Sequence, residues 1–119
     1  MTFGQVIAAA RKQVGLSQKD LAGRLMKEDG TPISPQYLND LERDRRNPPA
    51  EHLLRQFAEH LRLTPEYLYF MAGQLPEDLR QGAYGPDRVE AAFRAFRRTL
   101  RTAPRAAPRP ASRDSRSRG

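Results

Sequence analysis

Apolar residues near the start of the chain recur at helical spacing and predict a first helix over residues 3–14. They follow an i, i+3, i+4, i+7, i+11 pattern, which places one face of the helix against a core, and they are Phe3, Val6, Ile7, Ala10 and Val14. Thr2 is suited to cap this helix with Gln5 three residues later, and Gly15 is suited to end it.

A second and a third helix follow, separated by a polar segment. Ser17 is suited to cap the second helix, whose inward positions are Leu21, Ala22 and Leu25. The third helix is predicted over 34–46, because Ser-Pro starts helices and the two prolines after Asn47 disfavour helix before them. The intervening "MKEDGTPI" (26–33) either lengthens the second helix or forms a small loop.

Two more helices complete the predicted domain. The fourth spans about 50–62, and its apolar face is Leu53, Leu54, Phe57, Ala58 and Leu61. The fifth begins with Thr64 as cap and Pro65 in the first turn, and it stops at Gly73. The pattern therefore predicts an all-α, five-helix domain over residues 1–73 without strands.

The remainder of the chain divides into three predicted segments. Residues 74–85 resemble a linker with one turn around 76–80, and 103–119 contain mostly Ala, Pro, Arg and Ser, a composition that predicts disorder. Between them, 86–102 is predicted to be an amphipathic helix. Its apolar positions are spaced as in a narrow coiled-coil seam and favour dimerisation or packing onto the core; they are Val89, Phe93, Phe96 and Leu100.

Charge and composition narrow the function classes. The 119-residue chain has a net charge of +7, of which residues 1–72 carry +1 and residues 103–119 carry +4. Such an excess favours an anionic partner, nucleic acid first, although a basic tail can also serve solubility alone. The chain has no Cys, no apolar run near the roughly 20 residues of a membrane span and no signal-peptide pattern. We therefore expect a cytoplasmic, nucleoid-associated protein.

Two motifs carry a family resemblance. "LSQKDLAGRL" (16–25) followed by "ISPQYLNDLERDRRNPP" (33–49) resembles the helix-turn-helix domain of phage-repressor-like regulators, also called lambda-repressor-like or xenobiotic-response-element regulators. The resemblance covers about residues 3–72 and implies double-stranded DNA as partner, with the third helix in the major groove. The segment 26–33 departs from the family pattern, because it is longer than the usual turn of three or four residues. The angle at which the third helix would dock in the groove is therefore left open.

One face of the third helix carries the predicted base readers. Leu38 and Leu41 point inward, so the opposite face presents amide, carboxylate and guanidinium groups that can pair with base edges. By the resemblance, the base-reading positions are Gln36, Asn39 and Asp40. The alternative is an ordinary solvated face.

Other polar residues are assigned to the DNA backbone or to the fold. The predicted phosphate contacts are Gln18, Lys19, Tyr37, Arg43, Arg45 and Arg46. For Gln18 the alternative is support of the helix cap, and for Tyr37 it is packing. The resemblance also implies a structural ion pair between Arg11 and Glu42.

Together these features predict a transcriptional regulator, more often a repressor, that occupies a palindromic operator as a homodimer. No enzyme, cofactor or metal site is expected, since His52 and His60 lack zinc-motif spacing and no Cys can act as nucleophile. The alternative is a protein-interaction module of the same fold, antitoxin-like or controlled by a regulatory protein partner.

Overall fold

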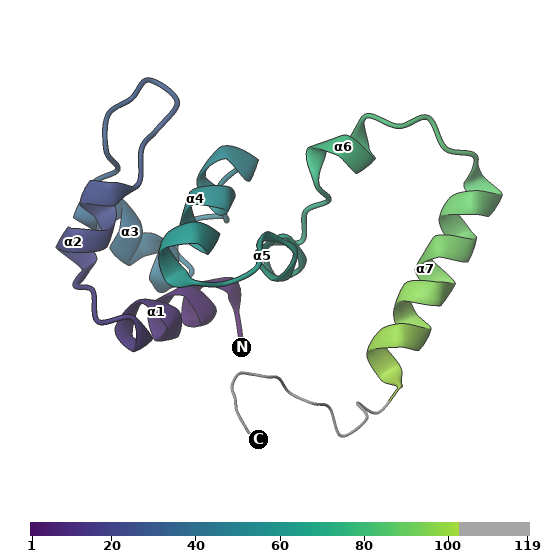
Figure 1. The fold of residues 1–119 in the computed structure, drawn as a ribbon, viewed down its shortest axis with the longest axis horizontal. Helices are drawn as coiled ribbons and strands as arrows, with labels where there is room; N and C mark the ends of the chain where they lie inside the picture. The colour runs from purple at the N-terminus through teal and green to yellow at the C-terminus, as the bar shows by residue number, and fades with distance from the viewer. Residues whose placement is uncertain (103–119) are drawn as a thin grey trace, which may run out of the picture. The chain divides into compact units, whose positions relative to one another are not determined.

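The computed structural model describes residues 1–102, which form an all-α chain (Figure 1). Its helices are α1 Phe3–Gln13, α2 Gln18–Arg24, α3 Pro35–Glu42, α4 Glu51–Leu61, α5 Pro65–Ala72, α6 Glu77–Arg80 and α7 Pro86–Arg101. The chain divides into one compact unit, Met1–Gly82, and a second, Ala83–Gly119, that contains α7. The predicted disordered tail, 103–119, lies outside the described residues.

The predicted helix starts are confirmed by their capping contacts. The hydroxyl oxygens of four N-cap residues each accept a hydrogen bond from the backbone N–H three positions later, and these residues are Thr2, Ser17, Ser34 and Thr64. Such caps satisfy one of the N–H groups that a helix start leaves without an intrahelical partner. Short helices thus begin at defined residues, which places their side chains in register with the core.

The core lies among α1 to α5. Its fully buried large side chains are Ile7, Leu21, Leu25, Leu38, Leu41, Leu54, Phe57 and Leu68. Phe3 meets Phe57 edge to face, with ring centroids 6.4 Å apart. Helix α3 packs against both α1 and α2, while α4 packs against α1 and α5. All five predicted helices therefore contribute to one core.

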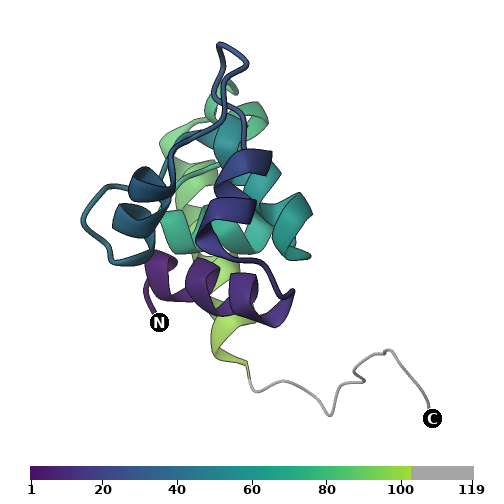
Figure 2. The ribbon, with the colours of Figure 1, turned by 90° about the vertical axis from the view of Figure 1, so that its left-hand side faces the viewer.

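The long turn before α3 is a projecting loop, not an extension of α2. Met26 and Pro32 form an antiparallel bridge, and the Lys27 N–H donates to the Thr31 carbonyl oxygen at 2.7 Å. Gly30 supplies the positive φ of +88° that the tip requires. Figures 1 and 2 show this loop extending away from the helices that it joins.

The base of this loop is fixed to the core. Leu25 and Ile33 are buried on either side of it, and the Ile33 N–H donates to the Leu25 carbonyl oxygen at 2.9 Å. The Gln56 side chain from α4 binds both the N–H and the carbonyl oxygen of Met26, each at 2.8 Å. The extra residues therefore leave the packing of α2 against α3 in place.

Helix α3 is shorter than the sequence predicts: it ends at Glu42 and not near Arg46. Arg43 forms the C-cap, and Asp44 adopts a left-handed φ of +60°, which stops the helix. Arg45 and Arg46 consequently lie in the loop before α4.

The first unit also extends beyond residue 73, into the predicted linker. Gln74 donates to the Pro49 carbonyl oxygen at 2.9 Å, and the Glu77 N–H donates to Glu51 at 2.7 Å. These contacts dock α6 against the start of α4, so the compact unit runs to Gly82. The turn expected around 76–80 is this helix.

Helix α7 covers nearly all of the predicted span 86–102. Its apolar stripe is exposed, at 38% for Val89, 48% for Phe93, 47% for Phe96 and 57% for Leu100. Glu90 and Arg94 form an i,i+4 ion pair outside the stripe. The helix is therefore strongly amphipathic along its whole length.

Candidate nucleic-acid interface

Helix α3 divides its side chains between the core and one polar face. Leu38 and Leu41 are fully buried, whereas Gln36 is exposed and Asn39 and Asp40 are half-buried. Successive residues of an α-helix are rotated by about 100° around its axis. The three polar residues and Arg43 therefore lie within about 100° of arc, on the side of α3 opposite the two leucines. The structure thus brings the three predicted base readers together on one face.

Arg11 and Glu42 form a bidentate ion pair between α1 and α3. Arg11 Nε donates to Glu42 Oε2 at 2.7 Å and Nη2 donates to Oε1 at 3.0 Å, while Nη1 donates to the Leu16 carbonyl oxygen at 2.9 Å. Both residues are only 9% exposed. The hydrogen bond to Glu42 raises the pKa of Arg11 above its ordinary value. The acidic residue among the arginines therefore faces the protein interior.

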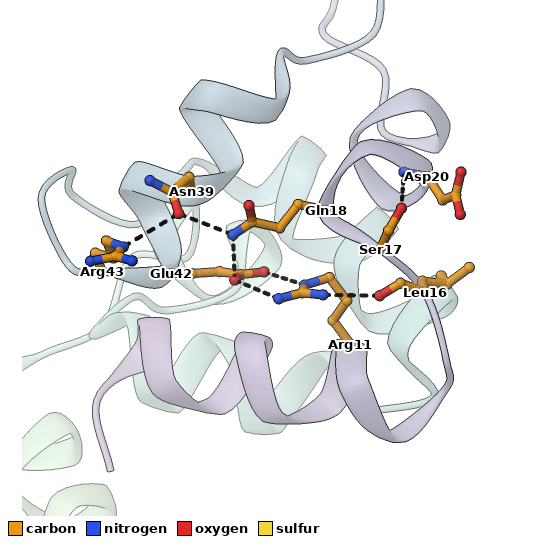
Figure 3. Close-up of polar contacts among 8 residues, drawn as sticks. All are labelled: Arg11, Leu16, Ser17, Gln18, Asp20, Asn39, Glu42 and Arg43. Carbon is orange, nitrogen blue, oxygen red and sulfur yellow. Dashed lines mark hydrogen bonds and ion pairs between the residues drawn. The ribbon is translucent and has the colours of Figure 1, made fainter.

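Gln18 joins this pair instead of pointing outward. Its Nε2 donates to Glu42 Oε1 at 2.8 Å and to Asn39 Oδ1 at 3.1 Å, which uses both amide hydrogens within the protein (Figure 3). In this arrangement the side-chain amide of Gln18 has no donor for a phosphate. The sequence alternatives were phosphate contact and cap support; the side chain instead links α2 to α3.

The same network fixes the orientation of Asn39. A carboxylate can only accept hydrogen bonds, so the group of Gln18 that faces Glu42 must be the side-chain NH2. The second hydrogen of this NH2 group also needs an acceptor, and on Asn39 only the side-chain oxygen can accept it. Arg43 Nε also donates to Asn39 Oδ1, at 3.4 Å. Figure 3 shows the Asn39 nitrogen turned away from Gln18. Asn39 therefore presents an N–H donor outward.

Gln36 and Asp40 interact on the outer face of α3. Gln36 Nε2 donates to Asp40 Oδ1 at 3.0 Å, and Arg45 Nη1 lies 3.9 Å from the same oxygen. Arg45 is also anchored by its backbone N–H, which donates to the Asp40 carbonyl oxygen at 2.8 Å. The carboxylate is thus partly neutralised by protein groups, which reduces its repulsion toward a phosphate.

Of the remaining predicted phosphate contacts, Tyr37 lies in α3, Arg43 and Arg46 follow this helix, and Lys19 lies in α2. Arg46 stacks over the Tyr37 ring, with its guanidinium carbon 5.3 Å from the ring centroid. Tyr37 is half-buried, while Lys19 and Arg43 are exposed. Tyr37 therefore has a packing role as a platform for an arginine, which stays available to an anion.

Asp44 is a structural residue that the sequence analysis did not single out. Its carboxylate accepts from the Gly4 N–H at 3.0 Å and from the Thr2 hydroxyl at 2.5 Å, at the start of α1. A Cβ on Gly4 would meet the carbonyl oxygens of Leu41 and Glu42 at 2.5 Å. An Asp just after a helix, where a left-handed residue is tolerated, was the available signal. This contact fixes the end of α3 against α1.

The described residues show no group of three or more His, Asp or Glu that could hold a metal ion. His52 is exposed and lies 3.1 Å from the Met26 carbonyl oxygen, and His60 is half-buried. Among residues 1–102 no helix is both long and apolar enough to span a membrane.

Comparison with known proteins assigns the family. A helix-turn-helix family model matches residues 7–68, more than half of the chain, and this match spans α2, the loop and α3. The chain belongs to the helix-turn-helix family. It is a DNA-binding transcriptional regulator of that family, with α3 in the position of the second, groove-facing helix of the motif.

Two solved structures resemble this helix-turn-helix protein at low identity. One is the clp gene regulator ClgR from Corynebacterium glutamicum, at 23% identity and a TM-score of 0.45, covering 82% of this chain and 85% of that one. The other is a SinR protein/SinI protein complex, at 19% identity and a TM-score of 0.47, covering 82% and 99%. No curated protein sequence matches the chain.

Proposed function

We propose that the protein recognises a specific DNA sequence through α3 and acts as a repressor by occupying its operator, without catalysing a reaction. The observation that carries this proposal is the outer face of α3, where Gln36, Asn39 and Asp40 lie together while Glu42 is turned inward. A merely solvated face would not need an amide held in one orientation from a neighbouring helix.

Base reading is assigned to the side chains of this face. Asn39 offers its N–H to an acceptor such as a purine N7, because its oxygen is occupied by Gln18 and Arg43. Gln36 is exposed at the first turn of α3, where the N-terminal residues of a groove-facing helix approach base edges. Asp40 sets the position of Gln36 and can itself accept from cytosine N4.

Backbone binding is assigned to the arginines of the α3–α4 loop and to the start of α2. Arg43, Arg45 and Arg46 are exposed and follow α3 directly, so they can hold phosphates on one side of the groove. Lys19 and the backbone N–H groups of the first turn of α2 replace the Gln18 side chain as the phosphate contact on the other side.

Dimerisation is assigned to α7. Its exposed stripe has the spacing of a coiled-coil seam, and a dimer would present two α3 helices to a palindromic operator. A partner protein that binds the same stripe is the second candidate, supported by the same exposure.

Selection of bound sequences from randomised duplex DNA tests the proposal. The full chain should recover a palindrome whose half-sites are about one helical turn apart. Phe93→Asp combined with Leu100→Asp should recover single half-sites, because the charges disrupt the stripe and no residue of α1–α5 is changed. Recovery of no preferred sequence would contradict base reading, and an unchanged palindrome from the double variant would contradict dimerisation through α7.

A further inference from the structure

The apolar stripe of α7 determines which residues of this helix flank a contact with a second helix. The stripe alternates between the d and a positions of a heptad, and its members are Val89, Phe93, Phe96 and Leu100. Glu90 and Arg97 each follow a d position and are therefore e residues. Ala92 and Thr99 each precede an a position and are g residues. Every residue of α7 is exposed, so both flanks of the stripe face solvent.

The charges of α7 are distributed unevenly along its length. Residues 86–92 contain two acidic residues and one arginine, for a net charge of −1, whereas residues 94–101 contain four arginines and no acidic residue, for +4. Two copies aligned in parallel would place the two strongly basic halves side by side. Two antiparallel copies would place the acidic half of each beside the basic half of the other. Charge complementarity therefore favours the antiparallel direction.

The e residues favour the same direction more specifically. Turning one helix end for end places the two e flanks on the same side of the stripe, whereas in a parallel pair each e flank faces a g flank. An antiparallel pair therefore brings Glu90 of each copy beside Arg97 of the other, twice by symmetry. In a parallel pair, Arg97 would face Ala92, which has no charge. Glu90 already pairs with Arg94 of its own helix, and its carboxylate has acceptor sites left for a second arginine.

We infer that the protein dimerises through an antiparallel pair of α7 helices, with Val89 opposite Leu100 and two Glu90–Arg97 ion pairs between the copies. This arrangement rests on the proposed dimerisation through α7 and adds its direction and register. Each chain enters α7 at Pro86, so the two chains enter at opposite ends of the pair. These ends lie about 24 Å apart, because an α-helix of 16 residues rises 1.5 Å per residue.

Disulfide crosslinking of the full chain tests the direction. The chain has no Cys, so Val89→Cys and Leu100→Cys each introduce a single thiol. The two variants are mixed in a glutathione redox buffer, and mass spectrometry identifies which chains become linked. The Val89→Cys chain should link to the Leu100→Cys chain. Identical positions should not link, because in the antiparallel pair they lie about 16 Å apart along the helix axis, too far for a disulfide.

The outcomes separate the direction of pairing from dimerisation itself. Links between identical chains would overturn the antiparallel arrangement and leave the proposed dimerisation through α7 standing. The absence of any link would overturn the arrangement as well. Sedimentation of the unchanged chain would then show whether the proposed dimer is missing or forms through another surface.

Two adjacent arginines provide a matched test of the ion pairs. Arg97→Glu places like charges beside each other at both e–e contacts, and it should raise the dimer dissociation constant about tenfold in sedimentation equilibrium. Arg98 occupies the f position, away from the stripe, so Arg98→Glu makes the same change of charge and should alter the constant less than about twofold. Equal effects of the two changes would overturn the predicted register.

Mixing complementary variants tests the same contact by gain of affinity. Glu90→Arg should weaken self-association as Arg97→Glu does, because each change places like charges together. A mixture of these two variants should form heterodimers, since each e residue of one chain then meets an opposite charge on the other. A mixture of Glu90→Arg with Arg98→Glu should not regain this affinity. Equal association in the two mixtures would overturn the Glu90–Arg97 pairing.

Discussion

Gln18 at the start of α2 and Glu42 at the end of α3 are joined by a 2.8 Å hydrogen bond, and the same carboxylate binds Arg11 of α1. One buried carboxylate therefore holds three helices together on the inner side of α3. The partner of Gln18 on the outer side is Asn39, so the fold and the proposed reading face share one hydrogen-bond network.

Glu42→Ala should destabilise the protein strongly. The change leaves the buried Arg11 without its counter-charge, and breaking a buried pair in this way costs roughly 3–5 kcal/mol. The free energy of unfolding from urea titration measures the loss. Glu28→Ala, at an exposed position of the projecting loop, is the control and should change it by less than about 0.5 kcal/mol. Equal effects of the two changes would show that the pair contributes nothing.

Gln18→Ala should relax base preference more than it reduces general affinity. Without Gln18, Asn39 loses the contact that turns its nitrogen outward, while the fold loses only about 1–2 kcal/mol. Affinities for the selected operator and for its single-base variants measure the preference. A uniform loss across all sequences, at an unchanged salt slope because the Gln18 amide carries no charge, would instead identify Gln18 as a phosphate contact.

Gly4→Ala and Gly23→Ala should have opposite effects on stability. A Cβ on Gly4 would approach the backbone oxygens of Leu41 and Glu42 to 2.5 Å, so α1 and α3 must separate, at a cost of roughly 1–3 kcal/mol. Gly23 lies in α2 with nothing within 4 Å of a Cβ, so alanine there should stabilise by about 0.5–1 kcal/mol. The thermal unfolding midpoints of the two variants test this contrast. Destabilisation by both changes would contradict the claim that Gly4 is tightly packed against α3 while Gly23 has open space around it.

The docking of α6 should weaken in acid. The hydrogen bond from the Glu77 N–H is the main reason that the pKa of Glu51 lies below its ordinary value. Ionised Glu51 therefore stabilises the folded state, and this contribution is complete at pH values above the pKa of Glu51 in the unfolded chain, about 4.3. The contribution is lost as the pH falls through the lower pKa of the folded state. The Glu77 amide signal should therefore shift below about pH 4, and the protection of this amide from hydrogen exchange, relative to the intrinsic rate at each pH, should fall.

Glu51→Gln provides the control for this pH dependence. Glutamine keeps an oxygen that accepts from the Glu77 N–H but does not titrate in this range. The acid-dependent change at Glu77 should disappear in this variant and persist in Glu59→Gln. Persistence in Glu51→Gln would assign the effect to another group.

Most of the fold could be predicted because its signals are local. Caps such as Ser34, breakers such as Gly73 and apolar residues at helical spacing act within a few positions, and the helices begin where these signals place them. The end of α3 was predicted too late, because prolines mark only the latest possible end. Asp44 ends the helix earlier through a contact with α1, forty residues away in sequence.

The candidate site was predictable in its residues but not in its contacts. The resemblance selected Arg11 and Glu42, and the structure contains that pair. It gave no reason to connect Gln18 with Asn39, because that bond depends on how α2 and α3 cross. The same holds for the projecting loop: its length was visible in the sequence, but its attachment through Gln56 depends on the position of α4.

The central claim is that α3 reads DNA bases, and comparing Gln36→Ala with Arg46→Ala on the selected operator tests it most directly. Affinities for the operator, its single-base variants and an unrelated duplex are measured over a range of salt concentrations. Gln36→Ala should cost roughly 1–3 kcal/mol on the operator and relax preference at one position, whereas Arg46→Ala should weaken all duplexes alike and reduce the salt slope by about one. Equal, sequence-independent effects of the two changes would contradict base reading by α3.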